Sequence, residues 1–214
     1  GIAFDDLLGI TLPQLINFFV TVFWIVLLIN AFNLIDGMDG VCAGLGVVSS
    51  LSLGILLLLL NQPIKACILF ILAGSCLGFL KYNFHPASIF LGDAGSMFIG
   101  FIIAILSLSG GINKSALISI LVPLLIVGIP IFDVILAIWR RVARRILNKI
   151  EGTGIKTKVF LPDLDHLHHR LASKYSQKKA AYVLYSIALI TSIIALGSII
   201  FDNYKMGILL LGGI

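Results

Sequence analysis

The sequence predicts an all-α, polytopic integral membrane protein with about six to seven transmembrane helices. Of its 214 residues, 59% are hydrophobic and only 12% are charged, whereas soluble domains carry roughly 25% charged residues. The mean hydropathy is +1.12. Long apolar runs alternate with a few short polar segments, which is typical of helices that cross a bilayer repeatedly.

Six apolar runs are long enough to span a membrane, since a spanning helix needs about 20 mostly apolar residues. A backbone surrounded by lipid must satisfy its own hydrogen bonds, so these runs are expected to be helices. Pro63 should open the third of them after a short link. A seventh run begins near Tyr204 and reaches Ile214, and the six complete runs are 12–32, 42–61, 64–81, 94–112, 115–138 and 180–201.

The chain begins at Gly1 and shows no signal-peptide pattern. We therefore expect residues 1–214 to form a single transmembrane domain that is an N-terminally truncated piece of a larger helical bundle. Cys42, Cys67 and Cys76 all lie inside apolar runs. Their spacing fits neither a metal site nor a disulfide framework, so they are expected to pack as small apolar residues.

Positive charge is concentrated in one loop. Of the 15 Lys and Arg residues, 11 fall between Arg140 and Lys179, which indicates a cytoplasmic loop and not a nucleic-acid surface. Counting spans from there places the loops near 33–41, 82–93 and 139–179 on the cytoplasmic side of the cell membrane. The polar segments of the chain therefore share one face.

The first polar segment reads NAFNLIDGMDG. Asn30, Asn33, Asp36 and Asp39 recur every three residues and would form one stripe on a helix. Unpaired polar groups in lipid cost several kcal/mol each, roughly, so the stripe should face a wet cavity or pair internally. The alternative is a helix end at Gly37, with Asp39 capping the next helix.

The second segment ends in FLGDAGS, just before a spanning run. Asp93 is either an N-cap or a ligand that bridges Mg²⁺ to a substrate phosphate. Phe90 could stack on a base and Asn83 could hydrogen-bond a base or ribose. Taken as single residues, both are more often structural.

The third polar region starts inside the membrane at Asp133, in GIPIFDVILAIW, and continues into an arginine-rich segment. Asp133 is a functional candidate, or it pairs with a nearby arginine. Arg140 and Arg141, with two further arginines one turn later, either anchor the helix to lipid phosphates or receive a phosphorylated lipid.

The segment DLDHLHHRL holds His166, His168, His169 and Arg170. Zinc is one reading, but the usual helical pair is spaced by four residues and no fourth ligand is evident. Imidazoles beside a guanidinium fit a phosphate clamp better.

Read together, NAFNLIDGMDG, NFHPASIFLGDAGS and PIFDV…RR…PDLDHLHHRL resemble the polyprenyl-phosphate N-acetylhexosamine-1-phosphate transferase family. The resemblance covers most of residues 20–172. HLHH followed by arginine is closer to the UDP-GlcNAc:undecaprenyl-phosphate GlcNAc-1-phosphate transferases than to the phospho-N-acetylmuramoyl-pentapeptide transferases.

The resemblance implies a Mg²⁺-dependent glycosyl-1-phosphate transferase, with Mn²⁺ as an alternative metal. A polyprenyl (undecaprenyl) phosphate would take a sugar-1-phosphate, expected to be GlcNAc-1-phosphate, from a UDP-sugar and release UMP. This would be the first membrane step of a cell-envelope polysaccharide. Phosphoryl transfer needs positioning and charge neutralisation, which suits a site at the membrane face.

By position, the resemblance implies three groups of site residues. Asp93 would be the metal ligand. Asn30, Asn33, Asn83, Phe90, Arg140, Arg141 and Arg170 would bind substrates, and the catalytic set would be Asp36, Asp39, Asp93, His166, His168 and His169.

One departure from the family concerns an aspartate pair in an early cytoplasmic loop. Asp5 and Asp6 are rejected as that pair, because residues 1–11 count to the opposite face. We therefore expect this chain alone to be inactive. A homodimer is compatible with the sequence, and the alternatives are a transporter that uses the polar stripe or an inactive fragment of the transferase.

Overall fold

A computed structural model describes residues 6–7, 10–11, 13–108, 122–150 and 175–200. It confirms the all-α fold, with one minimal antiparallel hairpin near the N-terminus. The seventh span near Tyr204 lies outside the described residues. The elements are β1 (Asp6–Leu7), β2 (Ile10–Thr11), α1 (Gln14–Ile35), α2 (Val41–Leu59), α3 (Pro63–Asn83), α4 (Gly92–Leu108), α6 (Gly128–Ile150) and α8 (Gln177–Ile200).

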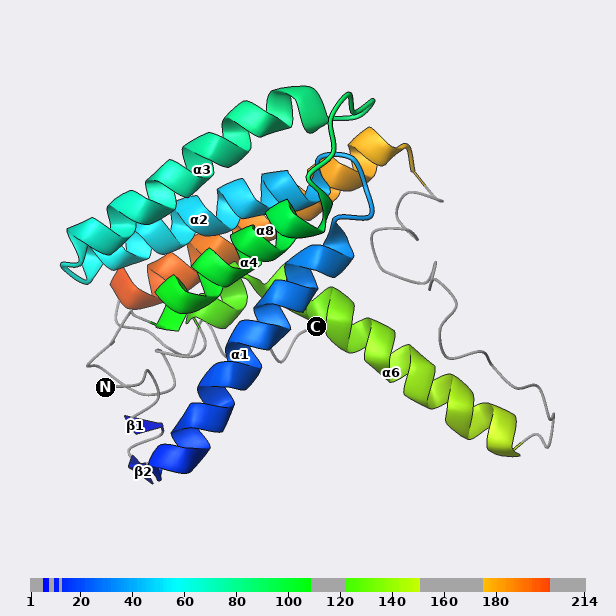
Figure 1. Cartoon of the computed structure of the whole chain (residues 1–214), viewed down its shortest axis with the longest axis horizontal. Coiled ribbons are helices and arrows are strands. Elements are labelled where there is room, and N and C mark those ends of the chain that lie inside the picture. Colours follow the sequence, from blue (N-terminus) through cyan, green and yellow to red (C-terminus); the bar gives the residue numbers. More distant parts are fainter. Residues whose placement is uncertain (1–5, 8–9, 12, 109–121, 151–174, 201–214) are drawn as a thin grey trace.

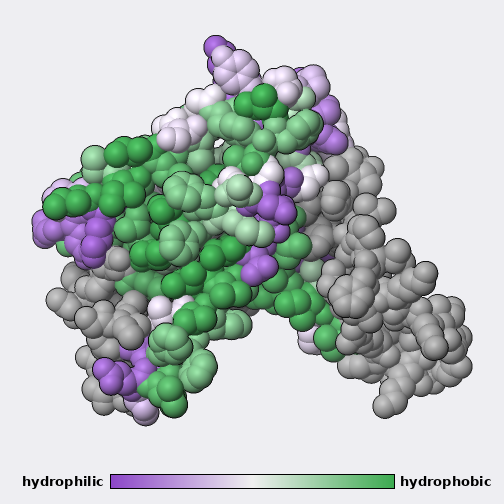
Figure 2. All heavy atoms as spheres, in the orientation of Figure 1, coloured by the Kyte–Doolittle hydropathy of each residue, from purple (hydrophilic) through white to green (hydrophobic). Residues whose placement is uncertain are grey.

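Four described helices are long and apolar enough to cross a membrane: α1, α2, α3 and α8. α4 is equally apolar but has 17 described residues. Hydrophobic residues cover the sides of the helices, and hydrophilic residues gather mainly at their ends (Figure 2). The chain is therefore a multi-pass membrane protein.

The central helix of the bundle is α2, which packs against α3, α4 and α8 (Figure 1). In its most apolar window 83% of the residues are buried, compared with 22% to 28% in the other three spanning helices. Its buried positions include many small residues, among them Gly44, Gly46, Ser49, Ser50 and Gly54. Small residues let helix backbones approach closely, which is how helices associate in lipid without a hydrophobic driving force.

α1 crosses α4 at a glycine contact. A Cβ added to Gly100 of α4 would lie 2.7 Å from the Leu28 carbonyl oxygen and 2.9 Å from the Ile29 Cα of α1. No residue larger than glycine fits at this position without a backbone shift. This contact holds the start of α4 beside the end of α1, where the polar residues are.

The single span predicted over 115–138 is wrong in one respect. Residues 122–126 are helical, the backbone turns at Val127, and α6 then continues to Ile150. Pro130 has no N–H to donate to the carbonyl of Ile126, four residues earlier. The hydroxyl of Ser49 on α2 donates to that carbonyl instead, at 3.4 Å. The far end of α6 extends away from the bundle (Figure 1).

Candidate active site

Five of the predicted site residues, Asn33, Asp36, Asp39, Asn83 and Asp93, gather where three segments meet at one end of the bundle. These are the turn from α1 to α2 at 36–40, the loop from α3 to α4 at 84–91, and the first turn of α4. We call the side chains that meet there the polar cluster. Its members are Asn33, Asp36, Asp39, Asn83, His85, Asp93 and Ser96.

Asn33 connects α1 to α4. Its Nδ2 donates to Asp93 Oδ1 at 3.0 Å and to the hydroxyl of Ser96 at 3.2 Å. The buried Ser96 hydroxyl in turn donates to the Gly92 carbonyl at 3.0 Å. Asp93 lies within the first turn of α4, one residue inside the helix, and its side chain is exposed. Asn33 therefore fixes one carboxylate oxygen and leaves the group accessible.

Asp36 follows the last residue of α1 and lies close to Asp93. Burial raises the pKa of its carboxyl to about 6, the Gly92 backbone N–H opposes this rise, and the negative charge of Asp93 adds to it. The two carboxyl groups, one half-buried and one exposed, bring acidic groups together at this point of the structure. The site would therefore be stabilised by a cation.

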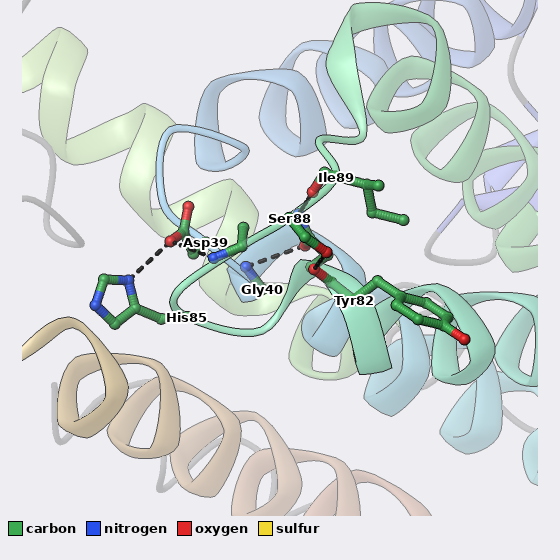
Figure 3. A network of polar contacts seen from close by, with 8 residues as sticks. Asp39, Gly40, Tyr82, His85, Ser88 and Ile89 are labelled. Atoms are coloured by element: carbon green, nitrogen blue, oxygen red, sulfur yellow. Dashed lines mark hydrogen bonds and ion pairs between the residues drawn. The ribbon is translucent and has the colours of Figure 1, made fainter.

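Asp39 faces the loop 84–91 and does not cap α2. Its Oδ2 lies 2.8 Å from Nδ1 of His85 and accepts the Ala87 N–H at 3.1 Å (Figure 3). The expectation that Asp39 caps α2 is wrong, because Gly40 occupies the N-cap position with φ +77° and no side-chain cap is made. Because Gly40 takes the N-cap position, the Asp39 side chain is available to hydrogen-bond the loop 84–91 from the turn 36–40.

Asn83, the last residue of α3, is buried, and both its side-chain oxygen and its side-chain nitrogen are hydrogen-bonded within the protein. Its Oδ1 accepts the Gly40 N–H at 3.0 Å, and its Nδ2 donates to the Ile89 carbonyl at 2.9 Å. In this arrangement Asn83 closes the loop. Phe90, the residue after Ile89, has 75% of its surface exposed. The loop therefore presents an aromatic ring on its outer surface.

α8 supports the turn at 36–40 from the other side. The hydroxyl of Tyr185 donates to the Gly40 carbonyl at 2.6 Å, and its ring packs against Gly44. Sequence reasoning had not identified Tyr185, His85 or Ser96. His85 lay within a quoted motif, and Ser96 follows Asp93 at the helical spacing of three residues, whereas nothing local marks Tyr185.

The predicted stripe on α1 divides into two parts. Asn33 and Asp36 face the start of α4, but the exposed Asn30 donates to the carbonyl of Val26 in its own helix at 2.7 Å. Asp133 is buried on α6. Arg140 lies further along α6 and is half-buried. The side chain of Arg141, and all of His166, His168, His169 and Arg170, lie outside the described residues.

The residues of the polar cluster fit a hard divalent cation. Mg²⁺ is usually held by one or two carboxylates together with substrate phosphates. Asp36 and Asp93 supply two carboxylates whose mutual repulsion such a cation would relieve. Among the described residues, no three acidic, histidine or cysteine side chains form a metal site on their own.

An apolar cavity of about 320 Å³ lies beside the polar cluster, between α3 and α4. Leu91 and Gly95 line the part of it nearest Asp93, while Ile68 and Ile102 line the opposite end. Ser75 is its one hydroxyl-bearing residue, and no member of the polar cluster lines it. The polar chemistry therefore belongs at the end of the bundle and not in this cavity.

Residues 2–111 match the sequence profile of the family described as glycosyl transferase family 4. This range is more than half of the chain and contains every member of the polar cluster. The chain belongs to glycosyl transferase family 4. The resemblance seen in the motifs is thereby confirmed.

Several named transferases are similar to this chain. A probable undecaprenyl-phosphate N-acetylglucosaminyl 1-phosphate transferase of Bacillus subtilis strain 168 is 44% identical over 178 residues, 83% of this chain and 47% of the relative. A decaprenyl-phosphate N-acetylglucosaminephosphotransferase of Mycobacterium tuberculosis strain H37Rv is 36% identical over 96% of this chain and 53% of its own length.

A third relative in the family is the undecaprenyl-phosphate α-N-acetylglucosaminyl 1-phosphate transferase of Escherichia coli strain K12. It is 31% identical over 80% of this chain and 45% of its own length. The chain thus spans about half the length of these relatives. A phospho-N-acetylmuramoyl-pentapeptide-transferase of Desulforudis audaxviator is 30% identical over 84% of the chain, in keeping with the closer resemblance to the GlcNAc branch.

Proposed function

We propose that this chain forms part of a transferase that moves GlcNAc-1-phosphate from UDP-GlcNAc to a polyprenyl phosphate, in the first membrane step of a cell-envelope polysaccharide. One observation carries the proposal. The family match covers the same residues, Asn33, Asp36 and Asp93, that the fold brings together in the polar cluster. The printed activities of the similar proteins supply the substrate classes.

In the proposed reaction, an oxygen of the polyprenyl phosphate attacks the sugar-linked phosphorus of UDP-GlcNAc. A new P–O bond forms there, and the bond from that phosphorus to the bridging oxygen breaks. The products are polyprenyl-diphosphate-GlcNAc and UMP, so both phosphates of the lipid product are accounted for. Such a transfer depends on in-line positioning and on neutralising charge.

The metal proposed for this site is Mg²⁺, with Mn²⁺ as an alternative. Asp93 would hold it with Asp36 close by, and it would neutralise charge on the diphosphate. Asn33 fixes the carboxylate of Asp93, and the exposed Phe90 ring is proposed to stack on the uracil. His166, His168, His169 and Arg170 are proposed to contact phosphate, as the family resemblance implies.

The site is proposed to face the cytoplasm. The arginine-bearing half of α6 and the basic residues that follow it in the sequence carry the positive charge that favours this side. A UDP-sugar is a cytoplasmic nucleotide, whereas the acceptor is a membrane lipid. A site at the ends of α1, α3 and α4 could be reached by both.

Further spans are proposed to be required for activity, because relatives about twice as long carry the printed activities. Expressed alone, this chain should release no UMP. A homodimer is a further proposal, which crosslinking in membranes would test.

The decisive experiment uses the complete product of the gene in membranes. Supplied with undecaprenyl phosphate, Mg²⁺ and radiolabelled UDP-GlcNAc, it should form a labelled lipid and release UMP. Asp93→Asn should remove nearly all of this activity with normal membrane abundance, whereas Ser88→Ala, a surface change in the same region, should leave it within about twofold. Full turnover by Asp93→Asn would contradict the metal role, and an inactive wild-type protein would contradict the function.

A further inference from the structure

His85 has one ring nitrogen bound within the protein and one that is free. Nδ1 lies 2.8 Å from Asp39 Oδ2, and the Ala87 N–H holds that same oxygen at 3.1 Å. Nε2 has no hydrogen-bond partner among the described residues, and 38% of the side chain is exposed. Figure 3 shows the free nitrogen directed away from Asp39. A carboxylate that fixes one nitrogen also fixes the direction of the other.

The charge of the polar cluster makes this free nitrogen significant. Asp36, Asp39 and Asp93 are acidic, and His85 is the one member of the cluster that can carry positive charge. With Nδ1–H donating to Asp39, the imidazolium form offers Nε2–H as a charged donor. Charged donors make shorter and stronger hydrogen bonds to phosphate oxygens than neutral donors do.

The start of α8 carries positive charge, and α8 contacts the residue that precedes His85. The ring of Phe84, the residue before His85, packs against the ring of Tyr182 on α8 with centroids 5.5 Å apart. Lys178 and Lys179 precede Tyr182 by four and three residues, so they share its face of the helix. Both are exposed, and they lie in the first turn of α8, where the helix dipole also favours anions.

We propose that His85, held by Asp39, donates through Nε2 to a phosphoryl oxygen of a substrate, and that Lys178 and Lys179 strengthen this anion site. The inference rests on the proposed function and deepens it, because it assigns one substrate phosphate to His85 and not to the carboxylates of Asp36 and Asp93. The phosphate could belong to the nucleotide or to the polyprenyl lipid. The two sources share the same chemistry and are separated by the test.

Two substitutions of His85 separate binding from loop support. In His85→Asn the amide nitrogen replaces Nδ1 and keeps the contact with Asp39, but the distal nitrogen is lost. In His85→Gln the amide nitrogen reaches the position of Nε2, but the contact with Asp39 is lost. If Nε2 binds phosphate, His85→Asn should impair substrate binding more than His85→Gln. If His85 only supports the loop, His85→Gln should be the more impaired variant.

The KM for UDP-GlcNAc and the KM for undecaprenyl phosphate are measured separately in the complete gene product. His85→Asn should raise one of them by roughly tenfold, the size expected for loss of a charged hydrogen bond. The substrate affected identifies the source of the phosphate. His85→Gln should raise the same KM less, and Ser88→Ala should change neither. Unchanged KM values in His85→Asn, or a larger defect in His85→Gln, would overturn the inference.

A binding measurement keeps the proposed function and the inference distinguishable. Purified protein is titrated with UDP, with uridine and with undecaprenyl phosphate, and no turnover is needed. If His85 binds a nucleotide phosphate, His85→Asn should weaken the binding of UDP by roughly tenfold and leave the binding of uridine unchanged. If it binds the lipid phosphate, only the binding of undecaprenyl phosphate should weaken. If neither weakens while wild-type turnover is present, the inference fails and the proposed function stands.

Discussion

At the scale of single residues, the acidic side of the polar cluster shows why a cation is expected. Asp36 and Asp93 are 57 positions apart in the sequence. Burial raises the pKa of Asp36 to about 6, and the nearby charge of Asp93 adds a smaller part of that rise. Asn33 donates to Asp93 but to neither oxygen of Asp36. The cluster therefore holds negative charge that the described side chains neutralise only in part.

The raised pKa of Asp36 predicts how stability depends on pH. Its native pKa of about 6 exceeds the ordinary 3.8, so the stabilising contribution is full below pH 3.8 and is lost as pH rises through about 6. Without Mg²⁺, Asp36→Asn should therefore be more stable than wild type at pH 7.5. After discounting for partial exposure, the gain should be about 1 kcal/mol.

Thermal unfolding of detergent-solubilised protein at pH 4.5 and pH 7.5 would measure this effect. The difference between the variant and wild type should be present at pH 7.5 and much smaller at pH 4.5. Adding Mg²⁺ at pH 7.5 should then stabilise wild type more than Asp36→Asn, since a ligand that binds the native state stabilises it. An equal response to Mg²⁺ would argue against a cation at this site.

The two asparagines of α1 should behave differently on substitution. Asn33→Ala removes the donor that holds Asp93 and Ser96, and should lower kcat/KM for lipid-linked GlcNAc formation by roughly tenfold or more. Asn30→Ala removes only a bond to its own helix, and its effect should stay within about threefold. Equal losses would support the sequence-based expectation that both bind substrate.

At the scale of helices, the approach of α1 to α4 depends on Gly100. An added Cβ would meet the Leu28 carbonyl at 2.7 Å, so Gly100→Ala should destabilise the protein by about 1–3 kcal/mol through overpacking. Gly74→Ala on α3 is the matched control, because a Cβ there would meet nothing within 4 Å and alanine favours helix. Thermal unfolding of both variants measures this, and comparable Tm values for both would contradict the close contact.

The helices were predictable from the sequence, while their tertiary contacts were not. Hydropathy placed α1, α2, α3 and α8 to within a few residues, since a bilayer imposes both length and apolarity. At the break before α6, Pro130 leaves the Ile126 carbonyl without its helical donor, and the hydroxyl of Ser49, 77 positions away, donates to it. No local sequence pattern shows which distant hydroxyl will donate to that carbonyl.

The candidate site was predictable in composition but only partly in arrangement. Asn33, Asp36 and Asp93 were expected and are brought together by the crossing of α1 and α4. Asn83 and Asp39 were expected to contact substrate, yet in the structure their hydrogen bonds join two loops. Residue type identifies a group that can hydrogen-bond, whereas its partner depends on which loops the fold places side by side.

At the scale of the whole molecule, the described polar site residues gather at one end of the helices. The polar cluster occupies the end that holds the 36–40 turn and the 84–91 loop, while the opposite end of α2 and α3 carries the short turn at 60–62. A transferase needs one reactive end, facing the cytoplasm. A transporter would need groups that become accessible from both sides of the membrane.

Site-directed labelling would distinguish these two functions. Cys42, Cys67 and Cys76 are first replaced by alanine, and single cysteines are then placed at the exposed positions Ser88 and Asn61. A membrane-impermeant maleimide should label Ser88→Cys only in inside-out vesicles and Asn61→Cys only in right-side-out vesicles. Because both positions lie in loops at helix ends, labelling reports which side each end faces.

Adding UDP-GlcNAc should change the extent of labelling at Ser88→Cys but not its side. Labelling of Ser88→Cys from both sides, with a balance that shifts on substrate addition, would favour a transporter over the transferase.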